Sequence, residues 1–426
     1  MSIWMWFALG CNPRLEGTEP GDCTNGADDD ADGLWDCDDD GCSDGPDCGG
    51  ASDDTAADRT EPDAPGSDSG EADADTDADT DADTDTDTDS DTDTDTDTDT
   101  DADTDTEVSY DVCDDGKAAY TSIQDAVDAS SDGDTIYVCA GTWSPFEVDG
   151  EELSIVGAGS DVTDIRGTTS TAVYLEDGEL ELSGFSIRAT SASGAAGFFQ
   201  EDGESHLHDL VFDYNVGGTV VYVQGGDAVI EDVVFEQNTV TAYVLGLGAH
   251  HEHFQVRHVI FRDNSASKVV YLFYGTFEFT NNILHDNSFS SSALATYSSG
   301  SFELTNNVLW NNQATLNSSA VRLVDLESGT FYNNIVSENS ANTVVNVGSS
   351  ATSDYNDFWD NSATYTGGGS NNLGADPRMV DPASGDFTID ASISPCLDAG
   401  NPSSTYNDPD GSRNDLGAYG GPHGSW

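Results

Sequence analysis

The sequence that decides the fold is one short pattern, repeated along the second half of the chain. It reads HDLVFDYN at 208–215, EDVVFEQN at 231–238, RHVIFRDN at 257–264 and TNNILHDN at 280–287, and continues as TNNVLWNN, YNNIVSEN and YNDFWDN. The repeats end on Asn215, Asn238, Asn264, Asn287, Asn312, Asn339 and Asn361, with spacings of 23, 26, 23, 25, 27 and 22 residues. A unit of this length holds three short strands, and it buries its apolar face only by stacking on its neighbours.

Three further columns run in step with these asparagines. Three residues earlier stand Phe212, Phe235, Phe261, Leu284, Leu309, Val336 and Phe358. Eight residues earlier stand Leu207, Ile230, Val256, Phe279, Leu304, Phe331 and Ser353. Five residues earlier, Leu210, Val233 and Val259 give way to Asn282, Asn307, Asn334 and Asn356. We expect all of these side chains to point inward, the amides hydrogen-bonding along the stack and satisfying buried turn backbone.

This pattern resembles the right-handed parallel β-helix of the pectin-lyase-like superfamily. The resemblance covers about 145–400 and implies an all-β solenoid lined by aliphatic and asparagine ladders. A leucine-rich repeat would show Leu-x-x-Leu-x-Leu, which this sequence lacks. Helical repeats would need apolar stripes with a period of 3.6 residues.

Both ends of the solenoid are predicted to be covered. In YTSIQDAVDASSDGDTIYVCAGTW (120–143), Thr121 and Gln124 fit a capping box, which predicts a short amphipathic helix followed by a strand at 135–140. The segment from residue 376 onward resembles the closing segment of many secreted bacterial β-helix proteins. We expect it to cover the unpaired edge of the last turn.

Charge divides the chain into two parts. Residues 1–107 carry 38 acidic and 2 basic side chains, and residues 108–426 carry 45 and 9, for a formal net charge of −72. Phosphate would repel such a chain, so a nucleic-acid partner is excluded. Residues 73–106 place an aspartate at every odd position. Alternating charge offers no apolar face, and repulsion extends the chain to roughly 110 Å, which predicts a disordered spacer.

The N-terminal sequence MSIWMWFALGC resembles a bacterial lipoprotein signal, with ALGC as the lipobox. The resemblance implies lipidation of Cys11, an anchor in the outer membrane of a Gram-negative bacterium, and display at the cell surface. An ordinary cleaved signal is the alternative. No later run approaches the about 18 apolar residues of a spanning helix.

Residues 23–48 combine aspartates, glycines and cysteines in two overlapping loops. Asp28, Asp30, Asp32, Asp36 and Asp39 with Gly33 occupy the ligand and turn positions of the first loop, and Asp36, Asp38, Asp40, Asp44 and Asp47 with Gly41 those of the second. Hard Ca²⁺ takes six to eight oxygen ligands, which alternate carboxylates around a tight turn supply. The segment resembles thrombospondin type 3 repeats, which implies structural Ca²⁺ braced by disulfides.

The eight cysteines favour an oxidising compartment, because no Cys-x-x-Cys zinc pattern is present. Cys113 and Cys139 flank one segment and are predicted to pair. The pairing of Cys23, Cys37, Cys42 and Cys48 stays open, and Cys396 is left over if Cys11 is lipidated. The predicted organisation is a signal (1–11), a calcium-loop segment (12–50), a linker (51–107), an N-terminal cap (108–144), the coils (145–375) and a C-terminal cap (376–426).

One set of aromatic residues is predicted to form an outward strip across neighbouring coils. Aligning AVYLEDG, GFFQEDG, VVYVQGG, AYVLGLG and VVYLFYG puts Tyr174, Phe198, Tyr222, Tyr243 and Tyr271 on it, with Glu176, Gln200 and Gln224 beside them. Rings flanked by polar groups suit sugar binding, whereas a ladder that only stabilises the stack is the alternative. His206 and His208 should share an outward face with Glu231, either solvated or holding a metal.

No catalytic set is recognised in the sequence. Arg166, Arg188, Arg257 and Arg262 stand at different places in the repeat, and no carboxylate cluster recurs at matched offsets. The leading hypothesis is therefore a secreted surface protein that binds a glycan or cell-surface partner without catalysis. The alternatives are a polysaccharide lyase or glycoside hydrolase acting on a neutral glycan, and a purely structural surface protein.

Overall fold

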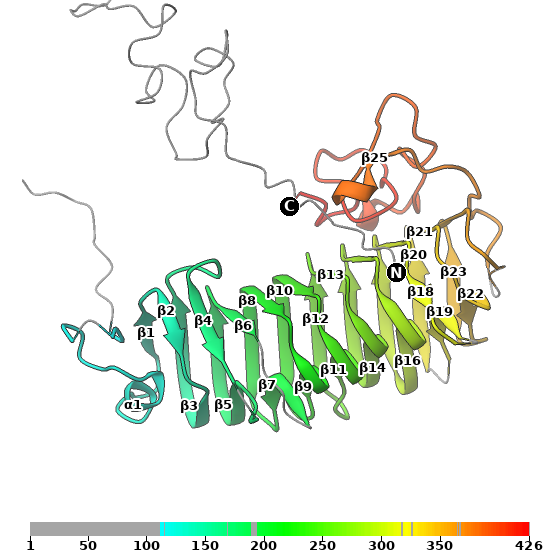
Figure 1. Cartoon of the computed structure of the whole chain (residues 1–426). Coiled ribbons are helices and arrows are strands. Elements are labelled where there is room, and N and C mark those ends of the chain that lie inside the picture. The colour runs from blue at the N-terminus through cyan, green and yellow to red at the C-terminus, as the bar shows by residue number, and fades with distance from the viewer. Residues whose placement is uncertain are drawn as a thin grey trace, which may run out of the picture. The chain divides into compact units, whose positions relative to one another are not determined.

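The computed structural model describes residues 111–425, except 115, 168, 189–193, 317, 325, 326, 364, 366 and 367, and only the backbone of 298 and 299. Within this part the chain winds into about nine turns of a parallel β-solenoid, as the sequence predicts (Figure 1). Every strand pairs in parallel with strands one turn away, except for a small antiparallel pair near the C-terminus. The predicted anchor at Cys11, the calcium loops and the acidic linker lie outside the described residues.

The stacked strands form three faces, which we number in chain order within a turn. The first face contains β1 (Asp134–Val138), β12 (His253–Arg257), β20 (Ser328–Tyr332) and β23 (Ala351–Asp354). The second contains β2 (Gly141–Trp143), β4 (Thr163–Arg166), β6 (Ser186–Arg188), β13 (Ile260–Arg262), β15 (Ile283–His285), β17 (Val308–Trp310), β21 (Ile335–Ser337) and β24 (Asp357–Trp359). The third contains β7 (Ala195–Gln200), β9 (Val216–Val223), β11 (Thr239–Leu247), β18 (Gln313–Ala314), β19 (Ser319–Leu323) and β22 (Thr343–Val347).

Six longer strands bend around a corner and belong to two faces. Those that run from the third face to the first are β3 (Phe146–Gly157), β5 (Val173–Ser183), β14 (Ser265–Thr280) and β16 (Ser288–Thr305). Those that run from the first face to the second are β8 (Glu204–Asp213) and β10 (Asp227–Glu236). Successive strands turn because each corner contains residues with positive φ, such as Asp209 and Asp232. These short polar side chains tolerate the left-handed conformation.

The core is built from the columns that the sequence predicts. Leu207, Ile230, Val256 and Phe279 are buried on the first face, and Phe212, Phe235 and Phe261 stack on the second. The ring centroids of Phe212 and Phe235, and of Phe235 and Phe261, are each 4.9 Å apart. Such stacking supplies dispersion contacts between turns in addition to the burial of apolar area.

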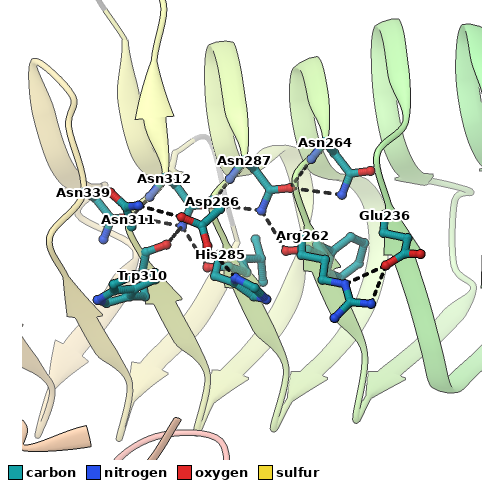
Figure 2. Close-up of polar contacts among 12 residues, drawn as sticks. Glu236, Arg262, Asn264, His285, Asp286, Asn287, Trp310, Asn311, Asn312 and Asn339 are labelled. Carbon is teal, nitrogen blue, oxygen red and sulfur yellow. Dashed lines mark hydrogen bonds and ion pairs between the residues drawn. The ribbon is translucent and has the colours of Figure 1, made fainter. Parts of the chain in front are cut away.

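Two asparagine ladders run through the solenoid, as the sequence predicts. In the first, the Oδ1 of each asparagine accepts hydrogen bonds from the backbone N–H and the Nδ2 of the asparagine one turn before it, at 2.9–3.2 Å. Figure 2 shows its members Asn264, Asn287, Asn312 and Asn339. The second ladder runs through Asn282, Asn307, Asn334, Asn356 and Asn372. Each Nδ2 of these ladders also donates to a backbone carbonyl, so the buried amides are satisfied by the turns they join.

The N-terminal end is closed by α1 (Ile123–Val127), whose Ile123, Ala126 and Val127 are buried. The predicted capping box is shifted: Ser122, not Thr121, is the N-cap and accepts from the N–H of Asp125. Gln124 instead exchanges hydrogen bonds with the backbone of Glu147 on β3, because its side chain faces the first full turn. The structure joins Cys113 and Cys139 in a disulfide beside this helix.

The C-terminal segment does not lie where the sequence predicts. Residues 368–373 pair with the strands of the last turn, through the bridges Ser353–Gly368 and Asp357–Leu373. The following segment, with β25 (Met379–Asp381), η3 (Pro382–Ser384), β26 (Asp386–Ile389) and η4 (Ser404–Tyr406), packs against the second face instead. It does so because the outward residues of that face are apolar in three turns. The resulting second core contains Ile283, Val308, Trp310, Ile335, Phe387, Cys396, Leu416 and Ala418.

A buried carboxyl group lies beneath this segment. Asp357 on β24 is the register partner of Ile335, one turn later, and it is fully buried. Its Oδ2 lies 3.7 Å from the Sγ of Cys396, which is a free thiol. Burial raises the pKa of Asp357 to about 6, although the N–H of Ala375 bonds its Oδ1. Burial likewise raises the pKa of the Cys396 thiol. Burial therefore favours the neutral form of both groups, although Asp357, with a pKa of about 6, still ionises near neutral pH.

We expect Asp357 to make the docked segment more stable in acid. In the unfolded chain an aspartate has a pKa of about 3.9, lower than the pKa of Asp357 in the folded chain. Such a group contributes its full stabilisation of the folded state below about pH 4, where it is protonated in both states. That contribution is lost as the pH rises through 6, and amounts to roughly 3 kcal/mol. Asp357→Asn should therefore gain stability relative to the parent protein between pH 4 and pH 7, measured by denaturant unfolding. The same substitution at the exposed Asp360 is the control, and it should change the stability by less than about 0.5 kcal/mol.

Candidate functional site

The outward side of the first face carries a groove of polar side chains. Along each strand, alternate residues point into the core and the residues between them point outward. The strands of successive turns pair in register, so the outward side chains stand in rows from turn to turn. The hollow over four turns has a volume of about 540 Å³. Its polar lining residues are Glu179, Glu181, Glu204, Ser205, His206, Asp227, Glu231, His253, Gln255 and Arg257. We call this surface and its continuation, described next, the first-face groove.

A second hollow of about 340 Å³ continues the groove toward the C-terminal segment. The two hollows share Gln255 and Arg257. Glu278 and Glu303 line the second hollow on the strand side, while Thr405, Tyr406, Pro422 and His423 form its other wall. That wall is fixed by hydrogen bonds from the Nδ2 of Asn281 to the carbonyls of Ala418 and Gly420, at 2.8 and 2.7 Å. The C-terminal segment therefore turns a flat sheet surface into a groove.

Three side chains at the centre of the groove form an ion network. The Nε2 of His206 lies 2.9 Å from one carboxylate oxygen of Glu231, and the Nε of Arg257 lies 2.9 Å from the other. Partial burial raises the pKa of Glu231, but the bond to His206 and the Arg257 charge outweigh it and leave that pKa lowered. Glu231 is therefore held ionised between two cationic or donor partners.

His208, two residues along the same strand, has its own carboxylate partners. Its Nδ1 lies 2.8 Å from Asp209 and its Nε2 lies 3.2 Å from Glu181. Burial lowers the pKa of His208, but the hydrogen bonds to Asp209 and Glu181 outweigh burial and raise it. The pKa of Glu181 is lowered by a hydrogen bond from Ser154 and by the two histidines.

Two carboxylates face each other in the second hollow. Glu278 on β14 and Glu303 on β16 are directly in register on neighbouring strands, and such strands are about 4.8 Å apart. Partial burial and the charge of Glu278 raise the pKa of Glu303. Sequence reasoning missed this pair, although each residue directly precedes an inward member of the column, Phe279 and Leu304. Alternation alone could have placed the two side chains on the outer surface.

The aromatic strip differs from its prediction at three of the predicted positions. Phe198 and Gln200 are fully buried, because they lie in register with the inward Val173 and Leu175. Phe199 is the outward residue of that turn. Two turns after Phe199, Gly246 and not Tyr243 pairs with Tyr222, because a bulge shifts the register of β11. The sequence alignment was wrong by one residue at the first site and by three at the second.

Gln200 has a structural role at the corner between the third and first faces. Its Nε2 donates to the carbonyls of Gly203, Gly225 and Asp227 at 2.9, 2.8 and 3.1 Å. Its Oε1 accepts from the hydroxyl of Ser205 at 2.6 Å. By contrast, Glu176 and Gln224 are exposed as predicted. Gln200 therefore satisfies the backbone of the corner and is not available to a ligand.

The rings of the strip are stacked on one another. Centroids are 5.4 Å apart for Tyr174 and Phe199 and 5.8 Å for Phe199 and Tyr222, with planes inclined by 10° and 13°. Lys268 lies over Tyr271, with its Nζ 4.4 Å from the ring centroid. A sugar ring packs on an aromatic face, and here the faces are covered by neighbouring rings or by the ammonium group. The geometry favours a stabilising ladder over a sugar platform.

Comparisons with known proteins give one family match and two distant structural matches. A family described as "Right handed beta helix region" matches residues 196–375. The crystal structure of pectate lyase Pel9A is 15% identical, with 70% of this chain and 90% of that chain covered and a TM-score of 0.45. Pectin methylesterase from carrot is 13% identical, with 62% and 86% covered and a TM-score of 0.27. No curated protein matches the sequence.

Among the described residues, no helix has both the length and the apolar character needed to cross a membrane. Parallel pairing from β1 to β24, three faces in each turn and two internal asparagine ladders agree with the family match to 196–375. The described part of the chain is a parallel β-helix, and its residues 196–375 are similar to the family of right-handed β-helix regions.

Proposed function

We propose that the protein binds a neutral glycan chain in the first-face groove. The observation that carries the proposal is the groove itself, which aligns carboxylates, imidazoles, an amide and a guanidinium over successive turns. Carboxylate and amide oxygens accept hydrogen bonds from sugar hydroxyls, while Arg257 and the histidines donate to them. None of these outward side chains is needed to fill the core.

The charge of the groove supports a neutral ligand. Seven carboxylates line its two hollows, against one guanidinium and three histidines. An acidic polysaccharide would be repelled by this surface, and more so by the whole chain at −72. A neutral polymer incurs no such repulsion. We also propose, from the sequence alone, that the lipobox-like start, the calcium loops and the acidic spacer serve to display the β-helix outside the cell.

A panel of soluble neutral and acidic glycans, measured by calorimetry, tests the proposal. The double variant Gln255→Ala with Glu278→Ala removes one amide and one carboxylate that face each other on neighbouring strands. We expect its affinity for the bound neutral glycan to fall by roughly 2 kcal/mol, or about 30-fold, the order of one neutral and one charged hydrogen bond.

The matched control is Glu176→Ala with Gln224→Ala, which removes the same chemical groups from the exposed third-face side. It should bind like the parent protein. If this control loses affinity while the groove variant does not, the aromatic strip is the binding site and the groove proposal is wrong. Absence of binding across the whole panel would leave a structural role for the protein.

Hydrolysis of the bound glycan is the second candidate function, and the pair Glu278 and Glu303 favours it. A carboxyl group with a raised pKa beside a second carboxyl group is the arrangement that glycoside hydrolases use as acid and partner. Glu278 and Glu303 stand on strands about 4.8 Å apart, and the two carboxyl groups of retaining enzymes are about 5–5.5 Å apart. The release of reducing ends from the same glycans measures hydrolysis. Glu303→Gln should abolish this release, while its affinity for the glycan stays within a few-fold of the parent protein's. Release that Glu303→Gln leaves intact would exclude this pair.

A further inference from the structure

A cluster of metal-ligating side chains lies at the edge of the first-face groove, away from the carboxylate pair. Glu181, His206 and His208 each offer one donor atom, and these atoms lie within 4.8 Å of one another. The two imidazole centroids are 4.6 Å apart. His206 and His208 are two residues apart on β8, so alternation puts both outside, and Glu181 is the register partner of His206 on β5.

The fold does not require histidine at either position. In register with His206 stand Glu181 in the turn before and Val229 and Gln255 in the turns after. In register with His208 stand Ser183, Glu231 and Arg257. The fold therefore accepts residues of quite different chemistry at these outward positions. The two imidazoles and the carboxylate meet at one point only in this turn of the described chain.

Each histidine is also oriented by a carboxylate outside the cluster. The Nδ1 of His208 is bonded to Asp209 at 2.8 Å, which leaves its Nε2 beside Glu181. His206 is bonded to Glu231, which Arg257 holds in turn. Metal-binding histidines in proteins almost always have such a carboxylate or carbonyl on their second nitrogen, because it selects the tautomer and raises the basicity of the ligand.

The size and chemistry of the cluster suit zinc. Zn²⁺ binds imidazole nitrogen and carboxylate oxygen at about 2.0–2.2 Å, so donors in a tetrahedral site are roughly 3.4 Å apart. Small side-chain rotations would bring the three donors from their present separations to that value. All three side chains are reached by solvent, with exposures of 47% for Glu181, 38% for His206 and 23% for His208. An ion could therefore enter from the groove.

We propose that Glu181, His206 and His208 bind a Zn²⁺ ion, with a fourth coordination position open to the groove. Two histidines and one glutamate with an open position are the ligand set of catalytic rather than structural zinc sites. Water or a sugar hydroxyl of a ligand in the groove can take that position. The zinc site goes beyond the proposed glycan function, and its test needs no glycan.

The test uses the full chain with Zn²⁺ and Co²⁺ as probes, in excess Ca²⁺ to occupy the aspartate-rich segments. Competition with a chelator should give one high-affinity Zn²⁺ per chain. His208→Asn and Glu181→Gln should each weaken it by about 100-fold or more, and Asp209→Asn by about 10–100-fold. Asparagine tolerates the positive φ of 51° at position 209, so that variant keeps the fold.

His253→Asn is the matched control, because His253 lines the same groove but is outside the cluster. It should bind Zn²⁺ like the parent protein. Bound Co²⁺ should show the intense visible absorption of a four-coordinate site, whereas carboxylates alone give a weak octahedral spectrum. Equal affinity in His208→Asn and the parent, or equal losses in His208→Asn and His253→Asn, would overturn the site. A purely octahedral Co²⁺ spectrum would do the same.

Discussion

Gly226→Ala is expected to prevent the β-helix from folding, or to destabilise it by at least about 5 kcal/mol. Gly226 has a φ of +74°, and a Cβ atom there would lie 1.5 Å from the carbonyl oxygen of Gly203 and 2.6 Å from its carbon. These are backbone atoms of the preceding turn, so no side-chain rotation relieves the overlap. The strand corner would have to separate from its neighbour, which breaks the hydrogen bonds of Gln200 to the same corner.

The chain supplies a matched control at the same corner of the first full turn. Gly150 has a φ of +90°, but no atom lies within 4 Å of its Cβ position. Gly150→Ala should therefore cost only the backbone strain of a non-glycine residue, about 1–2 kcal/mol. Soluble yield, circular dichroism and denaturant unfolding of the two variants make the comparison. If Gly226→Ala and Gly150→Ala lose similar amounts of stability, Gly226 is not required for the close stacking of neighbouring corners.

Asn287→Ala is expected to cost about 5 kcal/mol, which lowers the melting temperature by roughly 10 °C or more. The Nδ2 of Asn287 donates to the carbonyl of Phe261 at 2.8 Å and to Asn312 at 2.9 Å, and its Oδ1 accepts twice from Asn264 at 3.0 Å. Alanine leaves these four buried partners without the bonds in the middle of the ladder (Figure 2). Unsatisfied buried groups each cost about 1–3 kcal/mol.

Asn287→Asp isolates the donor part of this effect, because it keeps the shape and the acceptor but cannot donate. It should be destabilising at neutral pH and less so in acid, where the carboxyl group regains a proton. Asn342→Ala is the exposed control and should change stability by less than about 0.5 kcal/mol. A loss for Asn287→Ala as small as that for Asn342→Ala would show that the ladder contributes specificity of register but little stability.

The proposed glycan and zinc sites share the groove and two of its residues, Glu181 and His206, but they are tested at different residues. Glycan binding rests on Gln255 and Glu278 in the hollow beside the C-terminal segment. Zinc binding rests on β5 and β8, which lie in neighbouring turns two or more turns away along the same face. Loss of glycan binding in the Gln255→Ala, Glu278→Ala variant should therefore leave zinc binding in place.

The amino-acid sequence by itself determined the fold class and the inward columns. The asparagine spacings predict turns of 22–27 residues, and each buried amide must stack on another amide to satisfy its donors. That requirement sets the register at the second face, so Phe212, Phe235 and Phe261 could be placed in the core from sequence. Where a buried side chain must hydrogen-bond to the equivalent residue of the next turn, the register of the turns can be predicted from the sequence.

Only the tertiary structure decided what the outer surface does. The third face has no amide ladder to set its register, and insertions at the corners shift it, which is why Phe198 and Phe199 were exchanged and Tyr243 was misplaced. The groove brings together residues that lie about one turn apart in sequence, and its far wall comes from Tyr406 and His423. Their position depends on apolar burial against β15, β17 and β21, a non-directional interaction that leaves no periodic trace in the sequence.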